Sequence, residues 1–373
     1  MGSAYTPGLT VSGDVVVRRT RRLPIKGEVL LTVGSAVHPD TVVARAMLPG
    51  PLQTLKLAEK LGCEPKDVGQ FFHLKEGDPV EKGQTVAVSK GLFGFFKQTV
   101  LSDYTGTIEA ISEVTGNALV REASIPVDVT AYIEGTIAEV LPDEGAIIET
   151  RGAMVQGIFG VGGERYGTIR VAVSGPDDVL HGDNIHEHDA GKILIAGAGV
   201  TYDAIAKAAQ LGVLGLVAGG IKDSDLTQFL GYDIGVAITG TEAIPLTLLV
   251  TEGFGFLAMA DRTFKLFQSL EGKGASINGA TQIRAGVIRP EVIVPLSERV
   301  ENAEAAGQVF ELKIGTPVRV IREPYFGRLG TVSDLPAQLM TVDSGTEVRV
   351  LKAKLEDGSE VLVPRANVEI VAG

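Results

Sequence analysis

The clearest hydrophobic pattern of the chain lies between residues 191 and 296. Near-continuous apolar runs that end in small residues occur there at 192–199, 214–221, 234–241 and 246–255. Runs of Val, Ile and Leu without polar alternation are typical of strands in a sheet that is covered on both faces. Apolar spacing between and after these runs predicts helices over 201–211, 224–231 and 257–270. The pattern therefore predicts a central α/β domain of three layers.

The ends of these strands are the first candidate site. Ligands of open α/β sheets bind beyond the carboxyl ends of the strands, and glycines there are expected to leave that rim open. Residues 240–245 are too short for a helical crossover, so the sheet is expected to be mixed. Glu252 could contact a ligand, or it could pair structurally with Arg284 or Arg289. The candidate ligand-binding residues are Gly197, Gly199, Gly219, Gly220, Thr239, Thr241, Glu252 and Gly253.

Residues 27–150 alternate short β-like runs with turn residues, and two short amphipathic helices are expected as an insertion over 51–72. The segment 74–87, LKEGDPVEKGQTVA, carries Gly-Asp and Gly-Gln turns around a central Val. It resembles the barrel-sandwich hybrid fold of biotinyl and lipoyl carrier domains, which also occurs in RNA polymerase large subunits. Lys90 and Lys97 lack the carrier context, so the resemblance implies the fold without the carrier function.

An apolar cluster stands where a carrier lysine would be. Phe93, Phe95 and Phe96 lie close together in the glycine-containing segment 88–100. Large apolar residues on such a loop either fill a gap between domains or dock a partner protein.

The last part of the chain, 310–373, follows a charged and alanine-rich linker at 297–309. Residues 315–332 have the form G-x-x-V-R-V-I-x-x-P-Y-F-G-x-x-G-x-V. This form resembles the KOW motif of transcription-elongation and ribosomal proteins, which implies a small SH3-like barrel. The resemblance implies contact with RNA, ribosome, polymerase or protein partners. The net charge of −1 over this last part of the chain favours a protein partner. The candidate contact residues are Arg322, Tyr325, Phe326 and Arg328.

Residues 151–190 are expected to form a Gly-rich crossing followed by a His-rich loop. His181, His186 and His188 stand there among acidic residues. On an extended strand, His186 and His188 would share one face and could approach one metal ion. The alternative is an ordinary polar loop before a sheet, and no metal or other cofactor is expected.

Charge and composition narrow the remaining possibilities. The chain has a net charge of −12, which disfavours binding of a phosphate backbone by the whole surface. Only residues 1–26 form a basic arm, with Arg18, Arg19, Arg21, Arg22 and Lys26, which could bind a polyanion or simply be solvated. One cysteine excludes an intrachain disulfide. No membrane-spanning run or secretory signal is evident, so a cytoplasmic protein is expected.

Taken together, the patterns predict a multidomain α+β protein. A barrel-sandwich hybrid-like β region covers 27–150, an α/β domain with a mixed sheet covers 191–296, and an SH3-like (KOW) barrel covers 310–373. The chain lacks a phosphate-binding loop of Walker form, a nucleophile motif and a complete dinucleotide fingerprint. A non-enzymatic scaffold with protein partners or self-association is therefore the preferred interpretation. The alternatives are a transcription- or translation-associated factor and a small-molecule or enzymatic site at the strand ends.

Overall fold

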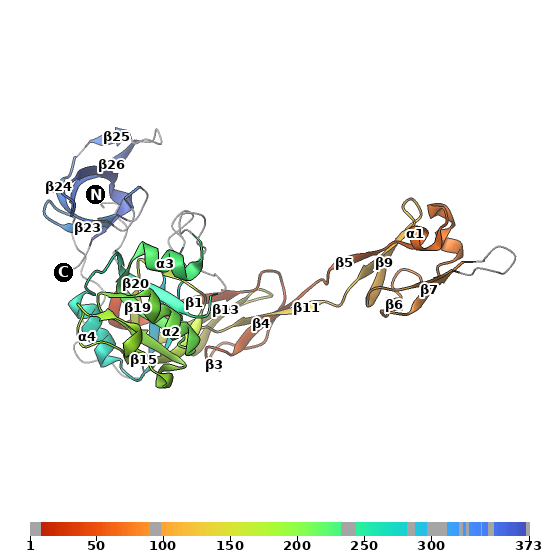
Figure 1. Cartoon of the computed structure of the whole chain (residues 1–373), viewed down its shortest axis with the longest axis horizontal. Coiled ribbons are helices and arrows are strands. Elements are labelled where there is room, and N and C mark those ends of the chain that lie inside the picture. The colour runs from red at the N-terminus through yellow and green to blue at the C-terminus, as the bar shows by residue number, and fades with distance from the viewer. Residues whose placement is uncertain are drawn as a thin grey trace.

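The computed structural model describes residues 9–89, 98–232, 244–281, 288–296, 312–320, 324–325, 328–336, 338–341 and 347–370. Of these residues 47% lie in strands and 15% in helices, so sheets dominate the fold, and one sheet curls into a half-barrel. Figure 1 shows an elongated molecule. A central body carries the C-terminal unit (residues 312–370) on one side, and a distal lobe (residues 52–121) stands away from the body on a narrow neck.

One large mixed sheet runs through the central body, in the order β14-β20-β19-β17-β15-β21-β22-β13-β12-β3. These strands are β3 (Ala36–Val37), β12 (Gly135–Leu141), β13 (Gly145–Gln156), β14 (Phe159–Val161), β15 (Arg165–Val171), β17 (Lys192–Ile195), β19 (Gly215–Ile221), β20 (Thr247–Phe254), β21 (Gly274–Asn278) and β22 (Glu291–Pro295). The strands β15, β17, β19 and β20 are parallel, whereas β14 and β21 are antiparallel to their neighbours. The sheet is mixed, as expected, because of β14 and β21. The predicted strand 234–241, on which that expectation rested, lies outside the described residues.

Helices cover both faces of the parallel strands. Ile205 of α2 (Tyr202–Gln210) and Leu226 of α3 (Asp223–Leu230) share a buried cluster with Leu216 of β19. Phe267 of α4 (Asp261–Ser269) shares a second cluster with Val217, the next residue of the same strand. Successive side chains of a strand point to opposite faces. The three layers predicted for this part of the chain are therefore present, with α2 and α3 on one face and α4 on the other.

The sequence predicted that the N-terminal basic segment forms a separate arm, and the structure corrects this prediction. The segment forms β1 (Val11–Arg22), which pairs antiparallel with β13 along its length. Its arginines contact carboxylates from other parts of the body, in the pairs Arg18–Glu149, Arg19–Glu291, Arg21–Glu164 and Arg22–Glu144. Cross-strand partners of opposite charge stabilise a sheet and neutralise a basic surface. These four arginines are consequently poor candidates for a polyanion site.

The expected Gly-rich crossing over 151–190 is also corrected. Residues 145–156, 159–161 and 165–171 are the strands β13, β14 and β15 of the large sheet. Gly160 shows why glycine is required there, because a Cβ on it would lie 2.8 Å from the Pro290 Cβ and 2.9 Å from the Gly279 oxygen. A glycine in a strand often marks such a close approach of another backbone segment.

The distal lobe has its own sheet and core. Its sheet has the order β5-β10-β9-β6, and β7 pairs with β8. The elements are β5 (Leu52–Leu55), α1 (Leu57–Leu61), η1 (Pro65–Gln70), β6 (Pro79–Val80), β7 (Thr85–Val88), β8 (Thr99–Leu101), β9 (Gly106–Ser112) and β10 (Asn117–Arg121). Leu57 of α1 and Val68 of η1 are buried with Ile108. The helical insertion predicted over 51–72 is therefore part of a larger inserted unit that extends to residue 121.

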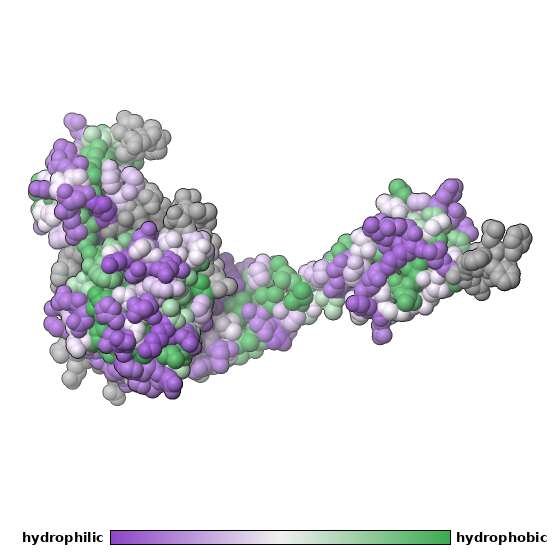
Figure 2. All heavy atoms as spheres, viewed as in Figure 1, coloured by the Kyte–Doolittle hydropathy of each residue, from purple (hydrophilic) through white to green (hydrophobic). Residues whose placement is uncertain are grey.

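The neck joins the lobe to the body through two extended segments. β4 (Val42–Leu48) pairs with β2 (Glu28–Val29) and with β11 (Ile125–Thr130), and the lobe lies between β4 and β11 in the chain. Beyond Arg45, where the pairing with β2 ends, only β4 and β11 of the described strands lie side by side, and such a two-stranded ribbon cannot cover both of its faces. Apolar side chains therefore reach the surface here (Figure 2), and Met47 and Ile125 are exposed. At Gly50 the segments nearly touch, since a Cβ there would lie 2.3 Å from the Glu122 oxygen.

The C-terminal unit is an all-β unit with the strand order β28-β23-β24-β26-β27, and β25 also pairs with β26. Its elements are β23 (Pro317–Val320), β24 (Leu329–Asp334), β25 (Leu339–Thr341), β26 (Glu347–Leu355), β27 (Glu360–Pro364), η6 (Arg365–Asn367) and β28 (Val368–Ile370). Val318, Val332 and Leu351 belong to its buried core. Among the described helices of the chain, none is long and apolar enough to cross a membrane.

We expect Gly50→Ala to destabilise the neck by about 1–3 kcal/mol, because overpacking in a tight contact costs that much. The added methyl group would meet backbone oxygens of Glu122 and Ala123 that cannot move as freely as a side chain. Urea unfolding measures the free energy, and Gly69→Ala is the control because nothing lies within 4 Å of its Cβ position. Equal stability of the two variants would contradict the close crossing at Gly50.

Candidate functional site at the strand ends

The glycines at the strand ends do not leave an open rim. A Cβ on Gly197 would lie 2.4 Å from the Gly175 oxygen, and one on Gly219 would lie 2.0 Å from the Leu257 oxygen. Backbone hydrogen bonds hold these segments in place, because the Leu257 N–H donates to the Ala198 oxygen over 2.9 Å. The expectation of an open rim is therefore wrong at these positions. Glycine lets two backbone segments approach each other, and here it accommodates loops of the same domain.

The remaining candidates at this rim follow the same pattern where they are described. A Cβ on Gly199 would lie 2.4 Å from the ring of Phe256, and one on Gly220 would lie 2.2 Å from the Gly255 oxygen. Gly253 has a φ of 152°. Thr239 and Thr241 lie outside the described residues. The contacts give Gly199 and Gly220 a packing role, and the assignment of Gly199, Gly220 and Gly253 to a ligand stays a prediction.

Glu252 at the end of β20 has two protein partners. Its Oε1 accepts a hydrogen bond from the Ala260 N–H, immediately before α4, over 3.2 Å. Its Oε2 accepts one from Arg319 Nη2 of β23 over 2.8 Å. Of the two structural partners that the sequence suggested, Arg284 lies outside the described residues and Arg289 pairs with another carboxylate. The structural alternative for Glu252 is therefore favoured, with a partner 67 residues away in the C-terminal unit.

Arg319 is one member of a four-charge network, which consists of Glu252, Arg289, Arg319 and Glu369. Arg319 Nη1 donates to Glu369 Oε1 over 2.9 Å, and Arg289 Nη2 lies 2.7 Å from Glu369 Oε2. Arg319 and Glu369 are cross-strand partners of β23 and β28, and their side chains are only 2% and 1% exposed. The central body and the C-terminal unit each contribute one positive and one negative charge. The charges alternate, so each one lies next to a charge of opposite sign.

Burial makes this network sensitive to the loss of any member. Moving an ion out of water costs several kcal/mol, which only close partners of opposite charge can offset. Some of its polar atoms have no hydrogen bond, including Arg319 Nε and the two atoms of the Arg289–Glu369 contact, which lie at ion-pair distance without hydrogen-bond geometry. The network therefore depends on charge balance, and it fixes the C-terminal unit against the end of β20.

The histidine loop does not form the extended strand on which His186 and His188 would have shared one face. His181 precedes one short helical turn, η3 (Gly182–Asn184), whereas His186 and His188 flank and enter another, η4 (Glu187–Asp189). The rings of His186 and His188 are stacked, with centroids 5.4 Å apart. In the part of the chain that the structure describes, no group of three or more ligand-type side chains could hold a metal ion.

Acidic side chains of this region have structural partners instead. Asp189 is fully buried and its Oδ2 accepts hydrogen bonds from Arg170 Nη1, over 2.7 Å, and from the His186 N–H. Asp203 of α2 accepts a hydrogen bond from the Gly182 N–H over 2.8 Å. Hydrogen bonds from the Thr201 side chain and the Gly182 backbone lower the pKa of Asp203. These contacts anchor the histidine loop to the body.

The candidate contact residues of the C-terminal unit are only partly described, since Arg322 and Phe326 lie outside the described residues, as do Phe93, Phe95 and Phe96. Tyr325 packs partly against the core of the unit, and Arg328 forms an ion pair with Asp357. Other cations of the unit also have partners: Arg319 in the four-charge network, Lys352 at 3.9 Å from Asp334, and Arg365, which donates to the carbonyls of Val350 and Pro336. Arg319, Arg328 and Lys352 therefore each lie next to a carboxylate.

We expect Glu252→Gln to destabilise the protein by about 3 kcal/mol, because it leaves two buried guanidinium groups with one carboxylate. Hydrogen exchange should increase in β23 and β28, which carry Arg319 and Glu369. Thermal unfolding and hydrogen exchange by mass spectrometry measure these effects. Glu59→Gln is the matched control, since Glu59 and its partner Lys56 are exposed and such a pair contributes less than about 1 kcal/mol. Similar effects of both substitutions would show that the network does not hold the C-terminal unit.

Comparison with known protein families and with curated protein sequences gives no match to this chain, so its residues and their contacts alone carry the functional interpretation.

Proposed function

We propose that this chain is a non-enzymatic binding protein that holds two protein-binding units, the distal lobe and the C-terminal unit, at opposite ends of a rigid body. The four-charge network is the observation that carries this proposal, because it fixes the C-terminal unit on the body through buried side chains. Within the described residues, the lobe has a separate core and joins the body through the neck. Such an arrangement suits a scaffold that brings two partners together.

The state of the strand ends supports a non-enzymatic role. An enzyme site needs titratable groups that face a cavity and can reach a substrate. Both carboxylate oxygens of Glu252 accept hydrogen bonds from the protein. A Cβ on Gly197, Gly199, Gly219 or Gly220 at these strand ends would lie against backbone or side-chain atoms. The alternative of a small-molecule site at this rim therefore has less support than the scaffold.

The finer fold assignments belong to the same proposal. In the C-terminal unit, the first strand β23 lies between the last strand β28 and β24, an order that supports an SH3-like (KOW) barrel. In the lobe, the segment 74–87 contributes β6 and β7 to two different strand pairings around one core. That arrangement supports a barrel-sandwich hybrid without a carrier lysine.

A transcription- or translation-associated factor is the second candidate function, and the KOW-like strand order favours it. Binding of RNA by the C-terminal unit has less support, because nucleic-acid binding requires cations that are free to neutralise phosphates. Arg328 and Lys352 each have a carboxylate neighbour. Purification of the full chain from lysate with and without ribonuclease separates the cases, since recovery of ribosomal or polymerase subunits that depends on RNA would favour the second candidate.

Site-specific photo-crosslinking of the full chain tests the scaffold. A crosslinking residue is placed at Val114 of the lobe or at Leu339 of the C-terminal unit, which are 89% and 56% exposed. Val16 of the body, 57% exposed, is the control position. We expect Val114 and Leu339 to give two different sets of crosslinked polypeptides, with each set present in material captured through the other position. One shared set, or no crosslinks above those at Val16, would contradict the proposal.

A further inference from the structure

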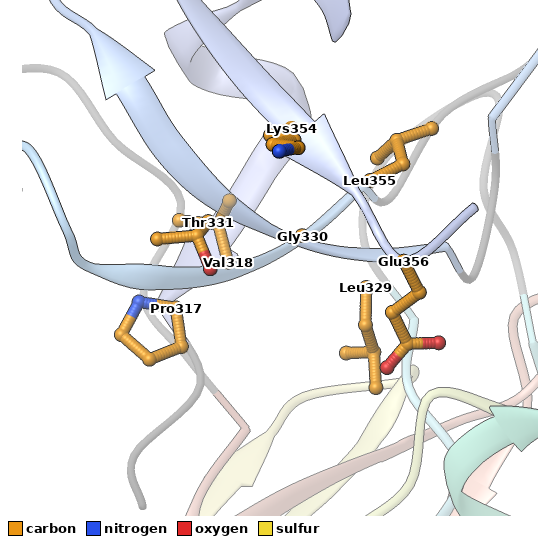
Figure 3. Close-up of a pocket in the computed structure, with 8 residues that line it drawn as sticks. All are labelled: Pro317, Val318, Leu329, Gly330, Thr331, Lys354, Leu355 and Glu356. Atoms are coloured by element: carbon orange, nitrogen blue, oxygen red, sulfur yellow. The ribbon is translucent and has the colours of Figure 1, made fainter. Parts of the chain in front are cut away.

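A groove of about 370 Å³ crosses three strands of the C-terminal unit (Figure 3). Val318, Gly330 and Leu355 are cross-strand neighbours on β23, β24 and β26, and their backbone forms the floor. Pro317, Thr331 and Lys354 stand on one side of this row, and Leu329 and Glu356 stand on the other. The groove therefore runs across the strands, between two walls of side chains.

Gly330 in the middle of the floor allows the strands to approach closely. A Cβ on it would lie 2.7 Å from the Lys354 oxygen and 3.1 Å from Leu355 Cδ2. Val318 and Leu355 are buried in the core of the unit, at 1% and 3% exposure. The floor is thus fixed by core packing, and a ligand would meet a surface that is already formed.

The chemistry of the walls indicates which kind of ligand would fit. Pro317 and Leu329 provide apolar surface on opposite sides, with Lys354 on one wall and Glu356 on the other. Neither Lys354 nor Glu356 has an ion-pair partner within the described part of the chain. A polyphosphate would be attracted by Lys354 and repelled by Glu356. A protein segment can place an acidic side chain at one and a basic side chain at the other.

The groove also adjoins the contact that fixes this unit to the body. Leu329 of its second wall is the cross-strand partner of Arg319, a member of the four-charge network. Its position relative to the body is consequently set by the same buried charges. A segment bound there would lie on a surface that does not move independently of the body.

We propose that this groove binds an extended segment of a partner protein, with an apolar side chain over Gly330, an acidic side chain at Lys354 and a basic side chain at Glu356. The proposal rests on the scaffold function and names the chemistry of the partner at one of its two binding units. The apolar side chain supplies contact area, and the two charges orient the segment across the strands.

Selection from phage-displayed random heptapeptides on the immobilised full chain tests this chemistry. We expect the enriched sequences to share an apolar residue flanked by an acidic and a basic residue. Fluorescence anisotropy with a labelled enriched peptide then gives Kd. Lys354→Glu should weaken binding at least tenfold, whereas Arg349→Glu, an exposed cation on the same strand β26, should change Kd less than about twofold.

A charge exchange separates loss of recognition from loss of folding. A peptide in which Lys replaces the acidic residue should bind the Lys354→Glu protein at least tenfold more tightly than the original peptide does.

Absence of an enriched peptide class, equal effects of Lys354→Glu and Arg349→Glu, or failure of this exchange would overturn the proposed binding at the groove. Crosslinks from Leu339 of β25, outside the groove, report on the scaffold independently. Their persistence without peptide binding would reject the groove alone, and peptide binding without paired crosslinks would reject the scaffold alone.

Discussion

The alternation of charge among Glu252, Arg289, Arg319 and Glu369 is the interaction on which the arrangement of this molecule depends. Charges that are buried this deeply are tolerated only as a balanced set. The body contributes Glu252 of β20 and Arg289. The C-terminal unit contributes Arg319 of β23 and Glu369 of β28. The network therefore holds the C-terminal unit next to the end of β20 and sets the position of the groove at Gly330. One of its members, Glu252, also accepts a hydrogen bond just before α4.

Glycine lacks a Cβ atom, and a sequence alone does not show how the space that this leaves is used. A glycine at a strand end can leave space for a ligand or can let another backbone segment come close. Gly197 and Gly219 do the second, since the Gly175 and Leu257 oxygens lie where their Cβ atoms would be. Gly50 does the same in the neck, where two segments distant in the sequence cross.

Local patterns predicted the elements between β17 and α4, but neither the strands β1, β14 and β15 nor the partners of the elements. The helices α2, α3 and α4 and the strands β17, β19 and β20 lie where apolar spacing placed them, because that signal is contained in each segment. The pairing of Arg18 with Glu149, or of Arg319 with Glu252, joins residues far apart in the chain, and neither segment alone contains it. His186 and His188 do not lie on the extended strand that their alternation suggested, because a short helical turn occurs there.

The two ends of the distal lobe coincide, because Leu52 and Arg121 are direct cross-strand partners. The chain thus leaves the body and returns to it at a single point, with β4 and β11 already paired beneath. Elements whose ends meet in this way can be gained, lost or exchanged during evolution without disturbing the host fold. The lobe can accordingly diverge in sequence at a rate of its own, while the sheet that carries it stays constrained.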